Sequence, residues 1–127
     1  MSDPRRRVLI VDDEESIRRS LKAYLENEGY EVVDVGKGED GLDVLAQEPA
    51  DVAIVDMRLP GMDGNAFVEQ AHQLMPGMSF FIYTGSVGYK PPPNLQAIGV
   101  DEEHVFKKPL GDIAKLVDAM RNSLEPR

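Results

Sequence analysis

The sequence reads VAIVDMRLPGMDG over residues 52–64. The first four residues of this stretch are apolar, which predicts a buried strand over 52–55. Asp56 comes directly after this strand, and the proline and glycines of 59–64 predict a turn. Similar short apolar runs predict four more strands, at 8–11, 31–35, 79–83 and 105–106.

Segments with apolar residues at helical spacing separate these strands. The stripes are formed by Ile17, Leu21, Tyr24 and Leu25, by Leu42, Leu45 and Ala46, by Phe67, Ala71, Leu74 and Met75, and by Ile113, Leu116, Val117, Met120 and Leu124. Before the fifth strand, the prolines at 91–93 exclude a helix before residue 94, so at most a short helical piece over 95–98 fits. Strands that alternate with helices predict an α/β fold. We expect a doubly wound, five-stranded parallel sheet with helices on both faces and a short or irregular fourth helix.

The composition restricts the class of protein. The 127 residues include no cysteine and carry a formal net charge of −9. This length fits one domain, and the lack of cysteine excludes disulfides and thiolate metal sites and fits a reducing cytoplasm. The acidic balance disfavours direct nucleic-acid binding, and no apolar run approaches the ~20 residues that span a bilayer. We therefore expect an acidic, cytoplasmic single domain without a membrane segment.

In a doubly wound sheet, the residues just after the strands form the ligand site. Here those residues include Asp12, Asp13, Asp56, Thr84 and Lys108. Each alone has an ordinary explanation as a helix cap, a turn residue or a solvated side chain. Together they would gather three carboxylates, and two like charges ~4 Å apart repel by about 4 kcal/mol at an effective dielectric constant of about 20. A hard divalent cation such as Mg²⁺ would offset this repulsion better than one lysine alone.

Four motifs in register resemble the receiver domains of two-component response regulators. They are IVDDE at 10–14, VDMRLPGMDG at 55–64, YTG at 83–85 and KP at 108–109. The resemblance covers essentially the whole chain, and the second motif is the most specific. It implies a flavodoxin-like receiver fold with strand order 2-1-3-4-5. It also implies a single receiver domain over residues 1–127, with no effector domain in this chain.

The resemblance implies a role for the residues after the first and third strands. Asp56 matches the phosphoacceptor, which takes a phosphoryl group from a phosphohistidine. Asp13 matches a direct Mg²⁺ ligand, and Asp12 matches an acid that holds the metal through water. The backbone carbonyl of Arg58 would be a further ligand, and Mn²⁺ is an alternative metal.

The residues after the fourth and fifth strands match the rest of the site. Thr84 matches a hydroxyl that takes one phosphoryl oxygen, and Lys108 matches an ammonium that pairs with another. Pro109 suggests a cis Lys108–Pro109 peptide bond. The implied function is a signalling switch that catalyses only its own phosphorylation and dephosphorylation, not an enzyme with an external substrate. The implied partners are a sensor histidine kinase or a phosphotransfer protein, and an unknown downstream effector that reads the surface around the fourth and fifth strands.

The segment between the fourth and fifth strands departs from the family pattern. Val105 stands where receivers usually have a switch tyrosine or phenylalanine, and strand alternation turns the adjacent Phe106 to the other face. We expect residues 85–93 to form a mobile output loop. Either Tyr83, at the end of the fourth strand, or Tyr89, within this loop, could substitute for the missing aromatic residue.

Three other functions explain parts of the pattern. A phosphatase with an aspartate nucleophile would carry an acid two residues after Asp56, where this chain has Arg58. A flavodoxin-like ligand binder would have a hydroxyl- and glycine-rich loop after the first strand, whereas residues 12–15 are all acidic. A degenerate receiver used only for docking would not need the intact Asp12, Asp13, Asp56, Thr84 and Lys108. The pattern therefore favours a phosphoacceptor, and leaves open its oligomeric state and whether it acts alone or within a longer regulator.

Overall fold

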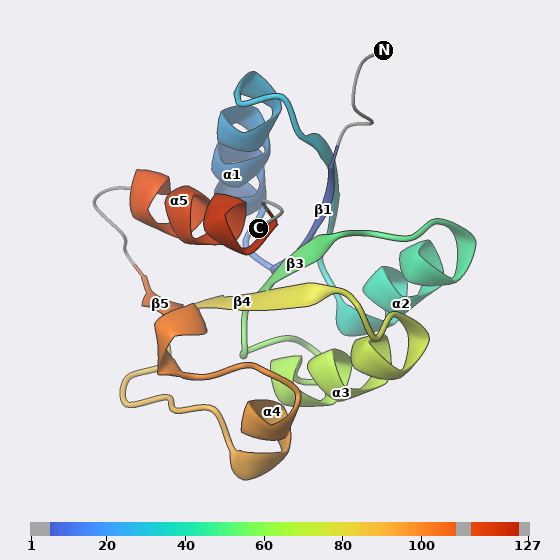
Figure 1. Ribbon diagram of the computed structural model, residues 1–127, viewed down its shortest axis with the longest axis vertical. Helices are drawn as coiled ribbons and strands as arrows, with labels where there is room; N and C mark the ends of the chain where they lie inside the picture. Colours follow the sequence, from blue (N-terminus) through green and yellow to red (C-terminus); the bar gives the residue numbers. More distant parts are fainter. Residues whose placement is uncertain (1–5, 109–112, 125–127) are drawn as a thin grey trace.

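The computed structural model describes residues 6–108 and 113–124 of the chain. Strands and helices alternate along these residues (Figure 1). In chain order the elements are β1 (Arg7–Val11), α1 (Glu15–Asn27), β2 (Glu31–Val35), α2 (Gly38–Gln47), β3 (Val52–Val55), α3 (Gly64–Leu74), β4 (Ser79–Thr84), α4 (Pro93–Ala97), the 3₁₀ turn η1 (Glu102–His104), β5 (Val105–Lys107) and α5 (Ile113–Leu124). None of the helices in the described ranges is long and apolar enough to cross a membrane.

The five strands in the described part of the chain form one parallel sheet in the order β2-β1-β3-β4-β5. This confirms the predicted doubly wound fold and its strand order. The direction of winding reverses at β1, because the chain adds β2 on one side of it and then β3 on the other. Val11 of β1 pairs with Val55 of β3. The residues that follow these strands, Asp12 and Asp56, therefore leave the sheet side by side.

Helices cover both faces of the sheet. α2, α3 and α4 lie on one face, and α1 and α5 lie on the other (Figure 1). Phe67 of α3 is fully buried against the first face, and Phe81 of β4 is buried against the second. Because the central strands are covered on both sides, their sequences are apolar without alternation. This explains why runs such as 8–11 and 52–55 predict buried strands so clearly.

The second helix differs in one detail from the prediction. The apolar pattern places Ala46 inward, but Ala46 is exposed. The buried stripe of α2 runs instead through Gly38, Gly41 and Leu45. Ala46 follows Leu45 directly, so it lies about 100° further around the helix and outside this stripe.

The fourth helix is short, as predicted, but it begins earlier. It spans Pro93–Ala97, although the proline run predicts no helix before residue 94. A proline fits the first turn of a helix, because an amide hydrogen there would have no partner within the helix. The Pro92 carbonyl accepts hydrogen bonds from the amides of Leu95 and Gln96, each at 3.0 Å. Leu95 is fully buried and anchors this short helix to the core.

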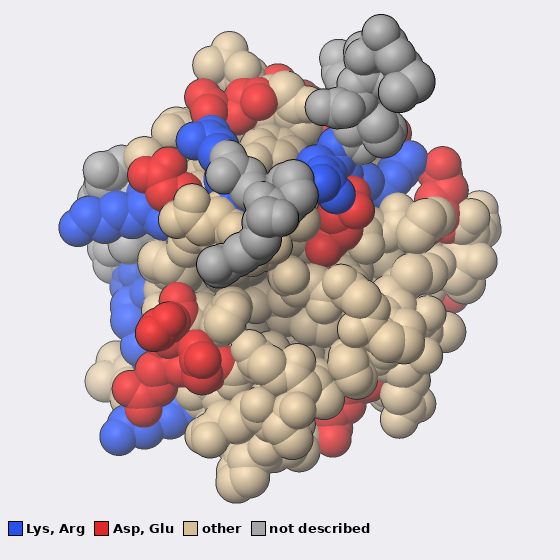
Figure 2. All heavy atoms as spheres, viewed as in Figure 1, with Lys and Arg blue, Asp and Glu red and all other residues tan. Residues whose placement is uncertain are grey.

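Charged side chains are distributed unevenly over the face seen in Figure 2. Acidic and basic side chains both gather over α1 and β1 and on the side where η1 and β5 lie, whereas the surface over α3 and α4 carries few charges. Charged side chains of both signs are therefore concentrated away from α3 and α4 on this face, and the edge of the sheet at β5 has mixed charge.

Candidate functional site

Three aspartates meet at the carboxyl ends of β1 and β3. Asp12 and Asp56 are only 2% and 4% exposed, whereas Asp13 is exposed. One carboxylate oxygen from each of the three lies within 4.8 Å of the other two. The two neighbouring strands therefore bring together acidic groups that are far apart in the sequence.

Backbone amides orient the two buried carboxylates. Oδ1 of Asp12 accepts a hydrogen bond from the amide of Glu14 at 2.9 Å. Oδ1 of Asp56 accepts one from the amide of Arg58 at 3.2 Å. Each carboxylate thus bonds to the amide two residues further along its own loop, which leaves its Oδ2 atom to face the site.

The loop after β3 folds back closely on itself. The amide of Gly64 donates to the carbonyl of Met57 at 3.1 Å. A Cβ atom on Gly64 would lie 2.5 Å from the Asp56 carbonyl oxygen, so only glycine fits here. The side chain of Asp63 caps α3 by accepting from the Ala66 amide at 2.8 Å. These contacts fix the short path from Asp56 to the first turn of α3.

Lys108 supplies the positive charge of the site. Its ammonium nitrogen lies 2.8 Å from Asp12 Oδ2 and 3.1 Å from Asp56 Oδ2. It also lies 2.7 Å from Glu14 Oε1, a contact that the sequence analysis missed, although Glu14 belongs to the acidic run after β1. The amide of Lys108 donates to the Thr84 carbonyl at 2.9 Å. This bond joins the end of β5 to the end of β4 and so directs the lysine toward the aspartates.

The pKa shifts reflect this crowding of charge. Burial raises the pKa of the Asp12 carboxyl, although hydrogen bonds from Lys108 and the Glu14 amide act in the opposite direction. Burial alone would lower the pKa of Lys108, but its hydrogen bonds to Asp12 and Glu14 outweigh burial and raise the pKa. The lysine is therefore firmly protonated at neutral pH and cannot act there as a base.

The charge balance of the site fits a divalent cation. Asp12, Glu14 and Asp56 contact the ammonium of Lys108, and Asp13 lies beside Asp12 and Asp56 in the same cluster, so four carboxylates share this one lysine among the contacts of the described residues. Carboxylate oxygens are the ligands that hard divalent cations prefer. The three aspartates can therefore hold a metal ion, which would reduce the repulsion that remains after pairing with Lys108.

The other predicted site residues lie around this cluster. Thr84 is fully buried at the carboxyl end of β4, and its Oγ1 accepts a hydrogen bond from the Ser86 amide at 3.2 Å. Arg58 contributes its amide to Asp56, and its side chain is exposed. Pro109 lies outside the described residues.

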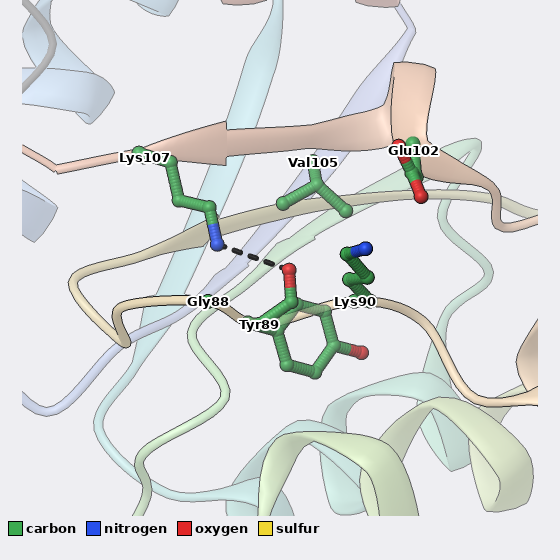
Figure 3. A pocket seen from close by; sticks show the side chains of 6 residues that line it. All are labelled: Gly88, Tyr89, Lys90, Glu102, Val105 and Lys107. Atoms are coloured by element: carbon green, nitrogen blue, oxygen red, sulfur yellow. Dashed lines mark hydrogen bonds between the residues drawn. The ribbon is translucent and has the colours of Figure 1, made fainter.

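The two tyrosines considered as replacements for the switch aromatic lie on opposite faces of the sheet. Val105 packs on the face covered by α2, α3 and α4, and Phe106 packs on the other face, as strand alternation predicts. Tyr83 is buried on the same face as Phe106. Tyr89 packs on the same face as Val105, and the two residues line one pocket (Figure 3). Of the two, Tyr89 is therefore the one that shares the environment of Val105.

Comparisons with known proteins agree with this architecture. The family model described as "Response regulator receiver domain" matches residues 8–121. The chain is 34% identical over 130 residues to the transcriptional regulatory protein GlrR of Escherichia coli (strain K12), which covers 98% of this chain and 28% of that protein. It is also 34% identical over 122 residues to the alkaline phosphatase synthesis transcriptional regulatory protein PhoP of Bacillus subtilis (strain 168), covering 96% of this chain and 44% of that protein. The chain therefore spans less than half the length of either curated relative.

Solved structures are similar over nearly the whole chain. A CheY-like response regulator receiver domain protein from Methanospirillum hungatei JF-1 has a TM-score of 0.82 and 31% identity, covering 95% of this chain and 94% of that one. The chemotaxis protein CheY4 of Vibrio cholerae has a TM-score of 0.80 and 25% identity, covering 95% of this chain and 100% of that one. The match of sequence and fold extends across the strands that carry the acidic cluster. The chain belongs to the receiver domains of two-component response regulators.

Proposed function

We propose that Asp56 is the residue of this receiver that accepts the phosphoryl group. The observation that carries this proposal is the position of its carboxylate, which is 4% exposed and lies 3.1 Å from the ammonium of Lys108. Asp12 and Asp13 flank it within the same cluster. The Asp56 carboxylate therefore lies next to the Lys108 ammonium and next to two further carboxylates that could bind a metal ion.

The reaction is an in-line transfer between two nucleophiles. A carboxylate oxygen of Asp56 attacks the phosphorus of a phosphohistidine on a sensor histidine kinase or a phosphotransfer protein. The P–N bond breaks, the histidine leaves with the electron pair of that bond, and an acyl phosphate forms on Asp56. Positioning and charge neutralisation supply most of the rate in such transfers.

The acidic residues would hold Mg²⁺, with Mn²⁺ as an alternative. Asp13 and Asp56 would bind it directly, Asp12 through water, and Arg58 through its backbone carbonyl. The bound ion supplies positive charge that offsets the charge of the phosphoryl oxygens. The fit rests on the three carboxylates that lie within 4.8 Å of one another and on their surplus of negative charge.

Thr84 and Lys108 would bind the phosphoryl group from the other side. Lys108 would exchange its contact with Asp56 Oδ2 for one with a phosphoryl oxygen. Thr84 would donate its hydroxyl to another oxygen, and the loop after β4 would move with it. The surface around β4 and β5 would change, and a downstream effector would read that change.

The domain organisation, the location and the dephosphorylation of this receiver are inferred from its family. We propose that residues 1–127 form one receiver domain that acts in the cytoplasm and also catalyses its own dephosphorylation. Two of its relatives are transcriptional regulators, of which it spans 28% and 44%. We therefore expect this receiver to communicate with an effector that has a transcriptional output.

A phosphorylation assay tests the proposal. The protein is incubated with acetyl phosphate and Mg²⁺, and intact mass spectrometry counts the phosphoryl groups. We expect one group on the parent protein, none after EDTA treatment and none on Asp56→Asn. The matched control Asp43→Asn changes an exposed carboxylate of α2 and should label like the parent. Failure of the parent to label, or equal labelling of Asp56→Asn, would reject the proposal.

A further inference from the structure

The loop between β4 and α4 is held by the last residue of β5. Nζ of Lys107 donates to the carbonyl of Ser86 at 3.2 Å and to the carbonyl of Tyr89 at 3.1 Å. The same ammonium lies 5.7 Å from the centre of the Tyr89 ring. Figure 3 shows the side chains of Lys107 and Val105 pointing from β5 toward this tyrosine. One lysine thus fixes both ends of the segment 86–89.

Tyr89 also joins this loop to the loop that follows Asp56. Its hydroxyl donates to Oδ1 of Asn65 in the first turn of α3 at 2.8 Å. Asn65 lies two residues after Asp63, the cap of the helix that begins directly after the Asp56 loop. The tyrosine therefore bridges the segment that carries Thr84 and the segment that carries Asp56.

The geometry of the turn makes this bridge possible. Gly88 has φ +76°, a conformation that L side chains rarely adopt, and it lies directly before Tyr89 in the turn that the Tyr89 amide closes on the Ser86 carbonyl at 3.4 Å. Tyr89 then lies beside Val105 in a pocket of about 270 Å³, which Gly88, Lys90, Glu102 and Lys107 also line. Because valine is small, the aromatic ring that occupies this part of the face comes from the loop and not from the strand.

Thr84 is linked through Ser86 to the hydrogen bonds that Lys107 makes with the loop. Its Oγ1 accepts from the Ser86 amide at 3.2 Å, and the carbonyl of Ser86 is one of the two groups held by Lys107. A displacement of the Thr84 side chain toward a phosphoryl oxygen would pull Oγ1 away from the Ser86 amide and so shift the Ser86 peptide. That rearrangement acts on the Lys107 contacts and, through Gly88, on Tyr89.

We propose that Tyr89 reports the state of Asp56: it is latched to Asn65 in the unphosphorylated protein and is released when Thr84 moves to the phosphoryl group. This inference rests on the proposed function of Asp56. Lys107 is a positioning residue in this scheme, because it acts through the loop and does not contact the phosphoryl group. The Tyr89 latch, defined as the hydrogen bond between Tyr89 and Asn65, is broken in the phosphorylated form.

The test observes Tyr89 directly. The full chain is labelled with 3-fluorotyrosine, and ¹⁹F NMR spectra are recorded with and without Mg²⁺ and beryllium fluoride, which adds to a carboxylate as a phosphoryl mimic. Tyr89→Phe identifies the resonance of interest, and Tyr24→Phe on α1 serves as the matched control. We expect the Tyr89 resonance to move on addition of the mimic, and Asn65→Ala to move it in the same direction without the mimic.

The kinetic consequence is a second readout. Because the latch is released when Thr84 moves to the phosphoryl group, it stabilises the unphosphorylated ground state but not the transition state of transfer. Tyr89→Phe should therefore increase the initial rate of labelling by acetyl phosphate about 3- to 10-fold, the equivalent of one lost hydrogen bond. Tyr24→Phe should label at the parent rate. An unmoved Tyr89 resonance in a parent protein that labels at Asp56, or an unchanged or lower rate in Tyr89→Phe, would overturn the latch alone. A parent protein that takes up no phosphoryl group would overturn the proposed function as well.

Discussion

The ammonium of Lys108 lies 3.1 Å from Oδ2 of Asp56, and the two residues are 52 positions apart in the sequence. The contact depends on two pairings of the sheet. β3 pairs with β4, and β4 pairs with β5, so the ends of all three strands meet at one edge. The Thr84 carbonyl then fixes the backbone of Lys108 at 2.9 Å.

Removal of the ammonium should destabilise the protein. Lys108→Met leaves Asp12 and Asp56 buried without their cationic partner. We expect the free energy of unfolding in EDTA to fall by about 2 to 3 kcal/mol, less than for a fully enclosed ion pair because Glu14 and solvent border the site. Urea titration measures this change, with Lys115→Met on the exposed surface of α5 as control. Equal stability of the two variants would show that Lys108 does not compensate the aspartates.

Removal of one carboxylate should have the opposite effect. Burial is the main cause of the raised pKa of Asp12, and the negative charge of Asp56 is a smaller cause in the same direction. Asp56 therefore adds to the repulsion in the site. Asp56→Asn should therefore raise the free energy of unfolding in EDTA by about 1 kcal/mol. Added Mg²⁺ should stabilise the parent more than this variant. Thermal unfolding in EDTA and in Mg²⁺ checks both points, and a variant stabilised by Mg²⁺ as strongly as the parent contradicts the proposed metal site.

The loop after Asp56 should not tolerate a larger residue. A Cβ atom at position 64 would lie 2.5 Å from the Asp56 carbonyl oxygen and 2.7 Å from Met57 Cα. Because both are backbone atoms, we expect Gly64→Ala to lower the free energy of unfolding by about 2 to 3 kcal/mol. Gly77→Ala is the matched control, since a Cβ there would meet nothing within 4 Å. Urea titrations of the two variants that give the same midpoint would refute this account of the loop.

The phenol of Tyr89 should ionise only at high pH. Burial, and secondarily the negative charge of Asp63, raises its pKa from 10.0 to about 12. The fold therefore favours the neutral phenol, so the stability that this group contributes is complete below about pH 10 and is lost as the pH rises toward 12. The difference in tyrosinate absorbance between the parent and Tyr89→Phe gives this titration, and a midpoint near 10 would contradict the half-buried position of the hydroxyl.

The sequence was sufficient to predict the sheet and the meeting of the acidic residues. Uninterrupted apolar runs mark strands that are covered on both faces, and the register of Val11 with Val55 then places Asp12 beside Asp56. The start of α4 at Pro93 was not predicted, because a proline is compatible with both a first helical turn and a loop.

The contacts of the loop residues could not be predicted from sequence. The bond between Tyr89 and Asn65 depends on the turn at Gly88 and on the length of the loop, neither of which has a periodic pattern. The contact of Glu14 with Lys108 depends on the rotamer of a half-exposed side chain, for which the acidic run alone gives no direction.

The central claim is that Asp56 carries the phosphoryl group. An acyl phosphate is reduced by borohydride, which converts the labelled aspartate to homoserine and leaves unlabelled aspartates intact. The protein is phosphorylated with acetyl phosphate and Mg²⁺, reduced, digested and mapped by tandem mass spectrometry. The account predicts homoserine at position 56 and at no other aspartate. Conversion at Asp12, Asp13 or Asp63 in place of Asp56, or no conversion at all, would contradict it.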